Sequence, residues 1–474
     1  MKRRAALLPA LLPTLLLAAC AVGPNYQRPA ALPPEQVRLT EALENGAVTP
    51  SPLPDQWWHL FNDTELDRLV TQALARNTDL RAAAANLQRA RAVLSEAGAA
   101  RLPTSGTSAK FSHSRTVNPA FGRAITNDFF SLGFDASYEA DLFGGVSRSI
   151  EAARADTASA QAAVDAARVS VAAETARAYA SACAFGEQAD VARETEQLQT
   201  QTLDLTQRRL AAGRGTRSEV DSATVLVEQA RAQVPVFEAE RRAALYALAV
   251  LTGDPPAVIL DAPAAKCRAV PMAPQPLPVG DGQALLARRP DVRQAERTLA
   301  ADTARIGLAT AALYPSITLL GSVSLGATKF GNLGNSGSVG YSVGPLISWN
   351  FPLNGAARAR VEQSKAVAEG SLARFDGAVL NALKEAEQAL ARAGGATSRE
   401  DALRRAMTAS ADAARLSRTR FDYGADSFLQ LLDAERQRAQ TRAALAQAEA
   451  DRADAQISVF KALGGGWEAP PPAL

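Results

Sequence analysis

The sequence predicts a mainly α-helical protein with a smaller β part, built from two tandem copies of one unit of roughly 210 residues. Three observations support this: residues recur at one constant spacing, long stretches lack helix breakers, and short segments alternate apolar and polar residues. The recurring residues are Arg209, Gly213, Ala223, Gln229, Arg231, Glu238, Arg241 and Gly253, which return 211 positions later as Arg420, Gly424, Ala434, Gln440, Arg442, Glu449, Arg452 and Gly464. Chance does not keep one spacing over such a length, so the body of the chain is a duplication.

The duplication also indicates how the chain is divided. Further upstream the spacing is 212, and it pairs Arg76, Asp79, Arg81, Leu87 and Pro103 with Arg288, Asp291, Arg293, Leu299 and Pro315. One residue was therefore lost or gained between the two copies. We expect the following segments: a signal peptide at 1–19, an extended proline-rich arm at 20–61, the first copy at 62–253, a linker at 254–280, the second copy at 281–464 and a tail at 465–474.

Each copy contains a pair of long helical stretches. No proline occurs at 146–212 or at 356–423, and a continuous helix over either stretch would be about 100 Å long at 1.5 Å per residue. The returning helices are expected at 216–251 and at about 426–463, where Pro235 should bend the first of them. Shorter helices precede each β segment, and Asn62 or Asp63 can cap the first of these helices.

Each copy also contains a segment with strand periodicity. Apolar and polar residues alternate within about 102–142 and about 315–352, and each segment is interrupted by a loop, so each predicts one β-hairpin. Four strands cannot close a membrane barrel, because known membrane barrels have at least about eight strands. If these strands lie in a membrane, several chains must share one barrel; soluble hairpins are the alternative.

The amino terminus carries a secretion and lipidation signal. Lys2, Arg3 and Arg4 precede an apolar run at 5–17, and the run ends in Leu17-Ala18-Ala19-Cys20. Small residues before a cysteine are typical of a lipobox, so we expect cleavage after residue 19 and a covalent lipid on Cys20. An ordinary signal peptide cut near residue 19 is the alternative. No other segment has the roughly 18 uninterrupted apolar residues that a transmembrane helix needs.

Two cysteines remain in the mature chain. An oxidising compartment permits a disulfide between Cys183 and Cys267, but their separation of 84 residues gives no geometric support for one. We therefore expect two free thiols, with Cys183 packed on a helix.

Composition excludes several classes of function. The 51 Lys and Arg residues nearly balance the 49 Asp and Glu residues, so no overall field attracts nucleic acid. His59 and His113 are the only histidines and lie in unlike segments, and no cysteine cluster supplies metal ligands, so we expect neither an enzyme nor a metal site. The lipid on Cys20 is the only non-protein group expected.

Several motifs resemble one family. The segment from Cys20 to Pro29, with the sequence CAVGPNYQRP, is similar to the mature start of outer-membrane efflux lipoproteins of the TolC and OprM type. The segments RPDVRQAE at 289–296 and AALYPSI at 311–317 look like the most recognisable internal stretch of that family. The sequence departs from the family pattern at Tyr138, where tryptophan is common, and at 351–355.

The resemblance implies a fold and a set of partners. The fold would be a long α-helical barrel continued by a transmembrane β-barrel that a homotrimer shares, with four strands from each chain. The chain would lie in the outer membrane of a Gram-negative bacterium, in contact with its lipid, and extend into the periplasm. Its partners would be a periplasmic adaptor protein and an inner-membrane resistance-nodulation-division transporter, and it would passively conduct drugs or other small molecules. A type I protein-secretion duct and a structural coiled-coil lipoprotein are the competing hypotheses.

The resemblance also assigns candidate sites. The two helix-to-helix turns are expected to dock the adaptor. The candidate docking residues are Arg209, Gly213, Thr216, Arg420, Gly424 and Ser427. These residue types also suit a plain turn, with arginine at a helix carboxyl end, a left-handed glycine and a capping hydroxyl. Leu429 and Asp433 match the stretch that narrows the tunnel in the family, and they share a helix face because they are four residues apart. A solvated helix surface is the alternative for Asp433.

Overall fold

The computed structural model describes residues 21–30, 32–41, 48–118, 122–349, 351 and 355–466. The expected signal peptide, its lipidation site Cys20 and residues 467–474 of the expected tail lie outside the described residues. The chain divides into two compact units, and each takes segments from both halves of the sequence. The strand unit contains the described residues up to 29 together with 89–158 and 296–373, and the helical unit contains 30–88, 159–295 and the described residues from 374 onward.

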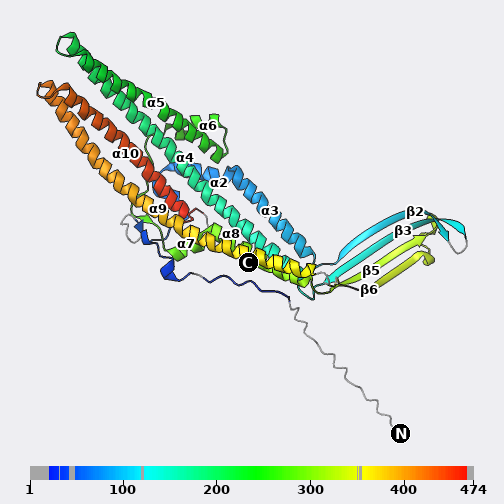
Figure 1. Cartoon of the computed structure of the whole chain (residues 1–474). Helices are drawn as coiled ribbons and strands as arrows, with labels where there is room; N and C mark the ends of the chain where they lie inside the picture. Colours follow the sequence, from blue (N-terminus) through cyan, green and yellow to red (C-terminus); the bar gives the residue numbers. More distant parts are fainter. Residues whose placement is uncertain are drawn as a thin grey trace, which may run out of the picture. The chain divides into compact units, whose positions relative to one another are not determined.

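Helices make up most of the described chain. Their bounds are α2 Thr64–Arg76, α3 Thr78–Ala99, α4 Gly145–Ala211, α5 Arg217–Thr252, α6 Pro256–Asp261, α7 Gly282–Arg288, α8 Pro290–Ala311, α9 Ala356–Asp422 and α10 Phe428–Ala462. The four long helices predicted from the sequence are confirmed to within two residues at each end. Helix α5 runs through Pro235 without ending there. Figure 1 shows α4 beside α5 and α9 beside α10.

Ion pairs link the two helices of each long pair at equivalent positions of the two copies. Arg193 of α4 binds Glu238 of α5, and Arg404 of α9 binds Glu449 of α10 at 2.9 Å. Both residues of the second pair lie 211 positions after those of the first. The duplication seen in the sequence is therefore also present in the contacts between helices.

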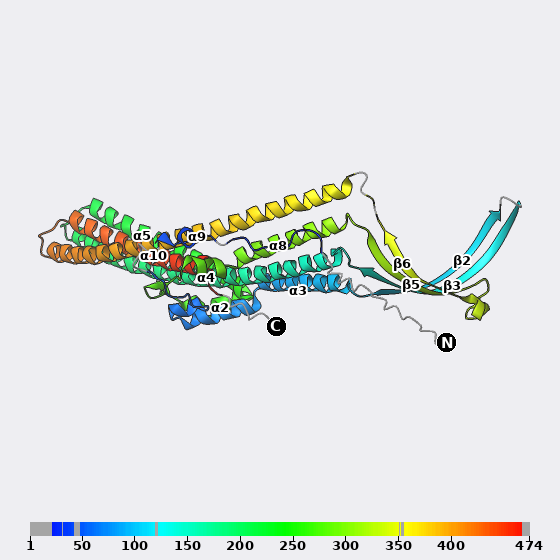
Figure 2. The same ribbon diagram turned by 90° about the horizontal axis from the view of Figure 1, so that it is seen from below.

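The two predicted hairpins are confirmed and join into one antiparallel sheet. The strands are β2 Thr104–Asn118, β3 Arg123–Ala140, β5 Ser316–Ala327 and β6 Val339–Ser348, in the spatial order β2-β3-β5-β6 (Figures 1 and 2). The registers pair Phe111 with Phe130 and Phe134 with Val323. In the described chain β2 pairs only with β3 and β6 only with β5, so both outer strands leave one edge without a ladder partner.

The helical unit has one large apolar core, to which the arm, the linker and the long helices all contribute side chains. Trp57 is fully buried, and its ring stacks on Phe460 of α10 at 4.9 Å between centroids. Leu245 and Leu248 of α5 and Leu390 of α9 belong to the same core. The strands β1 Val48–Thr49 and β4 Leu277–Pro278 form a short parallel pair that attaches the arm to the linker.

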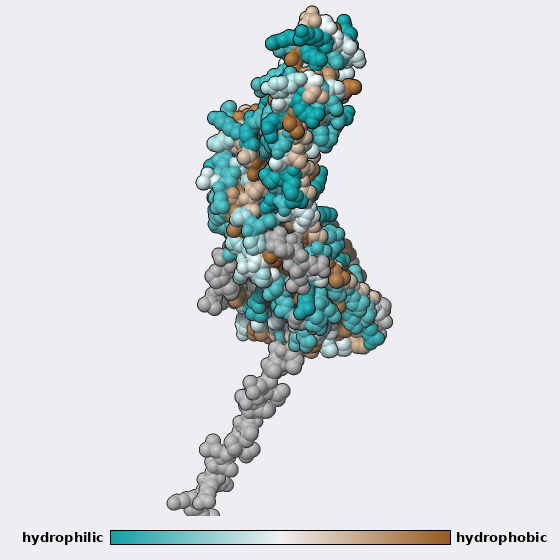
Figure 3. Space-filling view, turned by 90° about the vertical axis from the view of Figure 1, so that its left-hand side faces the viewer, coloured by the Kyte–Doolittle hydropathy of each residue, from teal (hydrophilic) through white to brown (hydrophobic). Residues whose placement is uncertain are grey.

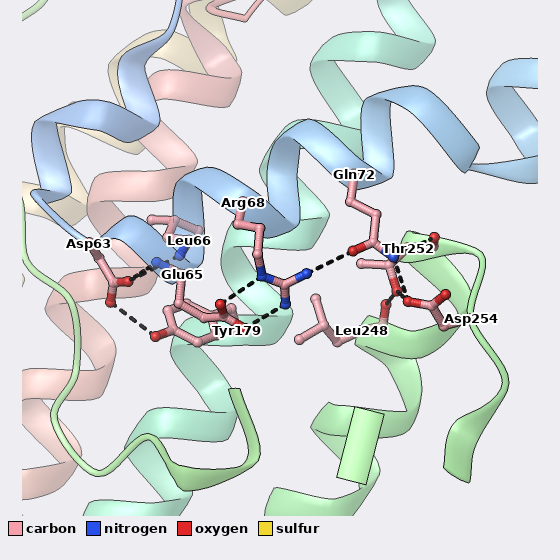
Figure 4. A network of polar contacts seen from close by, with 9 residues as sticks. All are labelled: Asp63, Glu65, Leu66, Arg68, Gln72, Tyr179, Leu248, Thr252 and Asp254. Atoms are coloured by element: carbon pink, nitrogen blue, oxygen red, sulfur yellow. Dashed lines mark hydrogen bonds and ion pairs between the residues drawn. The ribbon is translucent and has the colours of Figure 1, made fainter. Parts of the chain in front are cut away.

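A polar network anchors α2 to α4 and α5 (Figure 4). Asp63 caps α2, because its Oδ1 accepts hydrogen bonds from the backbone N–H groups of Glu65 and Leu66 at 2.9 and 3.0 Å. Its Oδ2 accepts a hydrogen bond from the Tyr179 hydroxyl of α4 at 3.0 Å. Gln72, further along α2, donates to Asp254 just after α5. Of the two caps expected for this helix, Asp63 is the one observed.

In the strand unit, the family-like start of the chain lies against α8 and the start of α4. Arg148 of α4 is buried and donates to the Asn25 side chain at 2.7 Å and to the backbone oxygen of Gly23 at 3.3 Å. The Tyr26 hydroxyl donates to Glu296 at 2.9 Å. Gly23 has φ +87°, and a Cβ there would lie 2.5 Å from the Cα of Gly307. Only glycine fits this close approach between two backbones.

The helical surface is largely hydrophilic on the face that Figure 3 shows, with small apolar patches between the polar residues. Among the described helices, none is both long enough and apolar enough to cross a membrane.

The expectation of two free thiols is wrong, because Cys183 and Cys267 form a disulfide. Cys183 is buried on α4, as expected, but the linker crosses α4 directly at this point. A Cβ added to Gly186, one turn further along α4, would lie 2.6 Å from the backbone oxygen of Cys267. Because Gly186 has no side chain, the linker can pack directly on the surface of α4. The separation of 84 residues between the cysteines does not reveal this contact.

Opening this disulfide should destabilise the helical unit. It closes a loop of 84 residues, for which the chain-entropy model gives about 4.5 kcal/mol. The double variant Cys183→Ala with Cys267→Ala should therefore lower the thermal midpoint of the helical circular-dichroism signal. The wild type in dithiothreitol should shift in the same direction, while the double variant should not respond to dithiothreitol. An unchanged midpoint in the double variant would contradict this.

Candidate functional site

The two turns that join the long helix pairs have the same backbone geometry. Gly213 has φ +71° and Gly424 has φ +75°, so both occupy the left-handed region. The N–H of Gly213 donates to the backbone oxygen of Leu210 at 2.9 Å, and the next N–H donates to that of Arg209 at 2.8 Å. The second turn repeats this pair of bonds, at 3.0 Å to Phe421 and 2.8 Å to Arg420. This pattern ends a helix by satisfying its last carbonyl groups.

Each turn is followed by a complete capping box. Thr216 accepts a hydrogen bond from the backbone N–H of Glu219 at 3.3 Å, and the Glu219 carboxylate accepts one from the N–H of Thr216 at 2.8 Å. Ser427 and Gln430 make the same two bonds at 3.3 and 2.7 Å. Thr216 and Ser427 are predicted from the sequence, whereas Glu219 and Gln430 are not. The spacing of a Ser or Thr and a Glu or Gln three residues later could have found both.

Arg209 connects the two turns to each other. Its guanidinium lies 4.5 Å from the centroid of the Phe421 ring at the end of α9, and it also donates to the backbone oxygen of Arg214 at 3.3 Å. A cation above an aromatic face is attracted by the ring quadrupole. Phe421 belongs to a small buried cluster with Ala223, Phe428 and Leu431, which come from α5 and α10. The turn residues of both copies therefore form one packed tip, which comprises residues 209–223 and 417–433.

Arg420 occupies the position equivalent to Arg209 but has a different partner. It binds Asp426 at 2.8 Å, and Asp426 also accepts a hydrogen bond from the Ser417 hydroxyl at 3.1 Å. Asp426 is nearly buried in this arrangement, so its charge is balanced within the turn.

Leu429 and Asp433 lie on the surface of the first turns of α10. Leu429 is 69 % exposed, an unusual environment for leucine. The Asp433 side chain is 70 % exposed and pairs with Arg436 at 2.5 Å. Both side chains are thus available to a neighbouring molecule, and neither contributes to the packing of the tip within one chain.

Glu435 is a buried carboxylate that the sequence analysis did not identify. It lies two residues after Asp433, and its side chain pairs with Arg438 at 2.7 Å. Burial raises the pKa of Glu435, and the charges of Arg438 and Arg418 only partly oppose this effect. No spacing rule distinguishes this glutamate from the exposed carboxylates on α10.

The fold defines a class of protein with two copies of a long helix pair and one open, four-stranded antiparallel sheet. Comparison with known proteins assigns the family. The sequence matches the family described as "Outer membrane efflux protein" over residues 69–254 and 282–465, and the chain belongs to this family. It is therefore an outer-membrane protein of the efflux-channel class.

Relatives match over nearly the whole chain. The outer membrane protein OprJ of Pseudomonas aeruginosa is 31% identical, over 97% of this chain and 95% of its own length. Nodulation protein T of Rhizobium leguminosarum bv. viciae is 32% identical, over 96% of this chain and 92% of its own length. The solved structure of the outer-membrane channel OprN superimposes with a TM-score of 0.89 at 34% identity, and covers 94% of this chain and 100% of the OprN chain.

Substitution of the left-handed glycine should loosen the tip. Gly424→Ala forces a Cβ into the left-handed region, which costs about 1–2 kcal/mol, so amide hydrogen exchange at 421–428 should become faster. Gly395→Ala is the matched control, because Gly395 lies within α9 with no atom within 4 Å of an added Cβ. The control should be neutral or stabilising. Equal exchange rates in the wild type and Gly424→Ala would contradict the proposed strain.

Proposed function

We propose that this chain is the outer-membrane exit duct of a tripartite efflux pump, in which three copies conduct small molecules passively across the outer membrane. The energy for transport is supplied by the inner-membrane resistance-nodulation-division transporter, and a periplasmic adaptor connects that transporter to the duct. The duct itself needs no catalytic group. In the described residues, no cluster of three His, Cys, Asp or Glu side chains is placed to hold a metal ion.

The open sheet is the observation that carries the proposal. Its outer strands β2 and β6 each leave one edge without a ladder partner among the described residues. Large apolar side chains such as Phe111, Phe134, Val323, Tyr341 and Val343 are exposed on the sheet. In lipid, unpaired backbone groups cost several kcal/mol each. Pairing β2 of one chain with β6 of the next removes both edges, and three chains then form a barrel of twelve strands.

The packed tip is proposed to be the part of the duct that the adaptor contacts. Its turns are the points where the long helix pairs end, and both are built alike by Gly213 with Thr216 and by Gly424 with Ser427. The tip also presents Tyr423, which is 87 % exposed and offers apolar surface to an adaptor. A covalent lipid on Cys20 would hold the amino-terminal arm at the membrane.

The purified protein should form a trimer with small, discrete single-channel conductance steps in planar bilayers. Its mass should be measured by native mass spectrometry on the same sample. A ring of identical chains closes both open strand edges, and a ring of three chains is what the family resemblance implies. A monomer without conductance would reject the duct.

Asp433→Ala should raise single-channel conductance and reduce the preference for cations. In a trimer Leu429 and Asp433 would each form a ring of three, and a ring of carboxylates attracts cations and repels anions. Asp221→Ala is the matched control, because Asp221 is also an exposed carboxylate in the early turns of a helix at the tip and pairs with an arginine, Arg217. Currents that are identical in Asp433→Ala and Asp221→Ala would remove Asp433 from the constriction.

A further inference from the structure

A groove lined by amide side chains runs between α4, α5 and α10 in the helical unit. Its volume is about 540 Å³, which lies within the range of about 300–1,000 Å³ typical of sites for small organic molecules. Six glutamines line it: Gln188, Gln199, Gln229, Gln233, Gln440 and Gln447. None of them belongs to the turns or to the exposed positions Leu429 and Asp433.

Two of these glutamines are buried with an unused acceptor. Gln188 is 5 % exposed and Gln199 is 3 % exposed. The Oε1 atom of each accepts no hydrogen bond from any residue in the part of the chain that the structure describes. The amide nitrogen of Gln188 donates to Oε1 of Gln447 at 3.2 Å, which fixes the direction of the amide. Buried acceptors are nearly always paired in folded proteins, so these two require a donor from outside the chain.

The remaining lining determines which donors fit. Arg436 is the only charged side chain in the lining, and it is already paired with Asp433 at 2.5 Å. The apolar part of the lining includes Val191, Leu226 and Phe237. An ionic ligand would lose its hydration here without gaining a counter-charge. An uncharged molecule with an apolar body loses little hydration free energy on entering the groove, and it gains free energy by burying its apolar surface.

We propose that this groove binds uncharged, amphipathic organic molecules that carry an N–H or O–H donor. The donor bonds to Oε1 of Gln188 or Gln199, and the apolar body rests on Val191, Leu226 and Phe237. The two acceptors are eleven residues apart on α4, which is about 16 Å along a helix. A small molecule therefore reaches one acceptor at a time, while an elongated molecule reaches both. This site is additional to the proposed duct and does not depend on it.

Chloramphenicol is a suitable probe, because it is uncharged and aromatic and carries one amide N–H and two hydroxyl groups. Its binding should be measured by equilibrium dialysis of the radiolabelled compound against the full-length protein in amphipol. Saturable binding is expected in the wild type. The double variant Gln188→Leu with Gln199→Leu should weaken it about tenfold, since each leucine keeps the volume but removes the acceptor. Gln201→Ala is the matched control, because Gln201 is exposed on α4 beside Gln199 and should not alter binding.

A second variant tests the place of binding without removing an amide. Ala443 lines the groove from α10 and is exposed, so Ala443→Phe should fill the groove, abolish binding and leave the circular-dichroism spectrum unchanged. Absence of saturable chloramphenicol binding to the wild type would overturn the proposal. Binding that survives Ala443→Phe would place the probe elsewhere and would overturn it too. Single-channel conductance should be measured on the same samples. Normal conductance without chloramphenicol binding would reject the groove but not the duct, whereas loss of conductance would count against the duct.

Discussion

The structure depends on the burial of Trp57 at the point where the arm, the linker and the long helices of both copies meet. Alanine-rich helices with charged outer faces gain little stability in isolation, and most of their stability comes from tertiary packing. Trp57 stacks on Phe460, and Gly465 approaches so closely that an added Cβ would lie 2.8 Å from the indole ring. The end of the second copy is thereby fixed to the segment that precedes the first. The long helices pack in this core, and the tip lies at their far ends. The packing of the core therefore determines where the tip lies.

The linker between the copies explains why equivalent residues have different partners. Arg241 and Arg452 are 211 positions apart, so they occupy equivalent positions on α5 and α10. Arg241 donates to the backbone oxygen of Ala265 in the linker. Arg452 instead binds the buried Glu400 at 2.8 Å. Burial alone would raise the pKa of Glu400, but the hydrogen bonds and charges of Arg452 and Arg404 outweigh it and lower the pKa.

The features that the sequence predicted are those determined locally. The long helices follow from proline-free, alanine-rich stretches, the hairpins from alternation, and the turns from Gly213 and Gly424 with their capping hydroxyls. The missed features depend on which segments meet in three dimensions. The Cys183–Cys267 disulfide requires the linker to cross α4 at Gly186. The burial of Glu435 and the unpaired Oε1 atom of Gln199 arise from neighbouring helices, and no spacing within one helix reveals them.

The contact between Arg209 and Phe421 has a mechanical consequence. Separating the turn of the first copy from that of the second would uncover the side of the Phe421, Phe428 and Leu431 cluster that faces α5, and would remove Arg209 from the Phe421 ring. Exposing three such side chains costs about 5–9 kcal/mol at the usual 1.5–3 kcal/mol each. This value is an upper limit for separating the two turns, because Phe421, Phe428 and Leu431 all belong to the second copy and would stay in contact with one another. The two turns of one chain therefore stay together, unless a molecule that supplies apolar surface from outside offsets this cost.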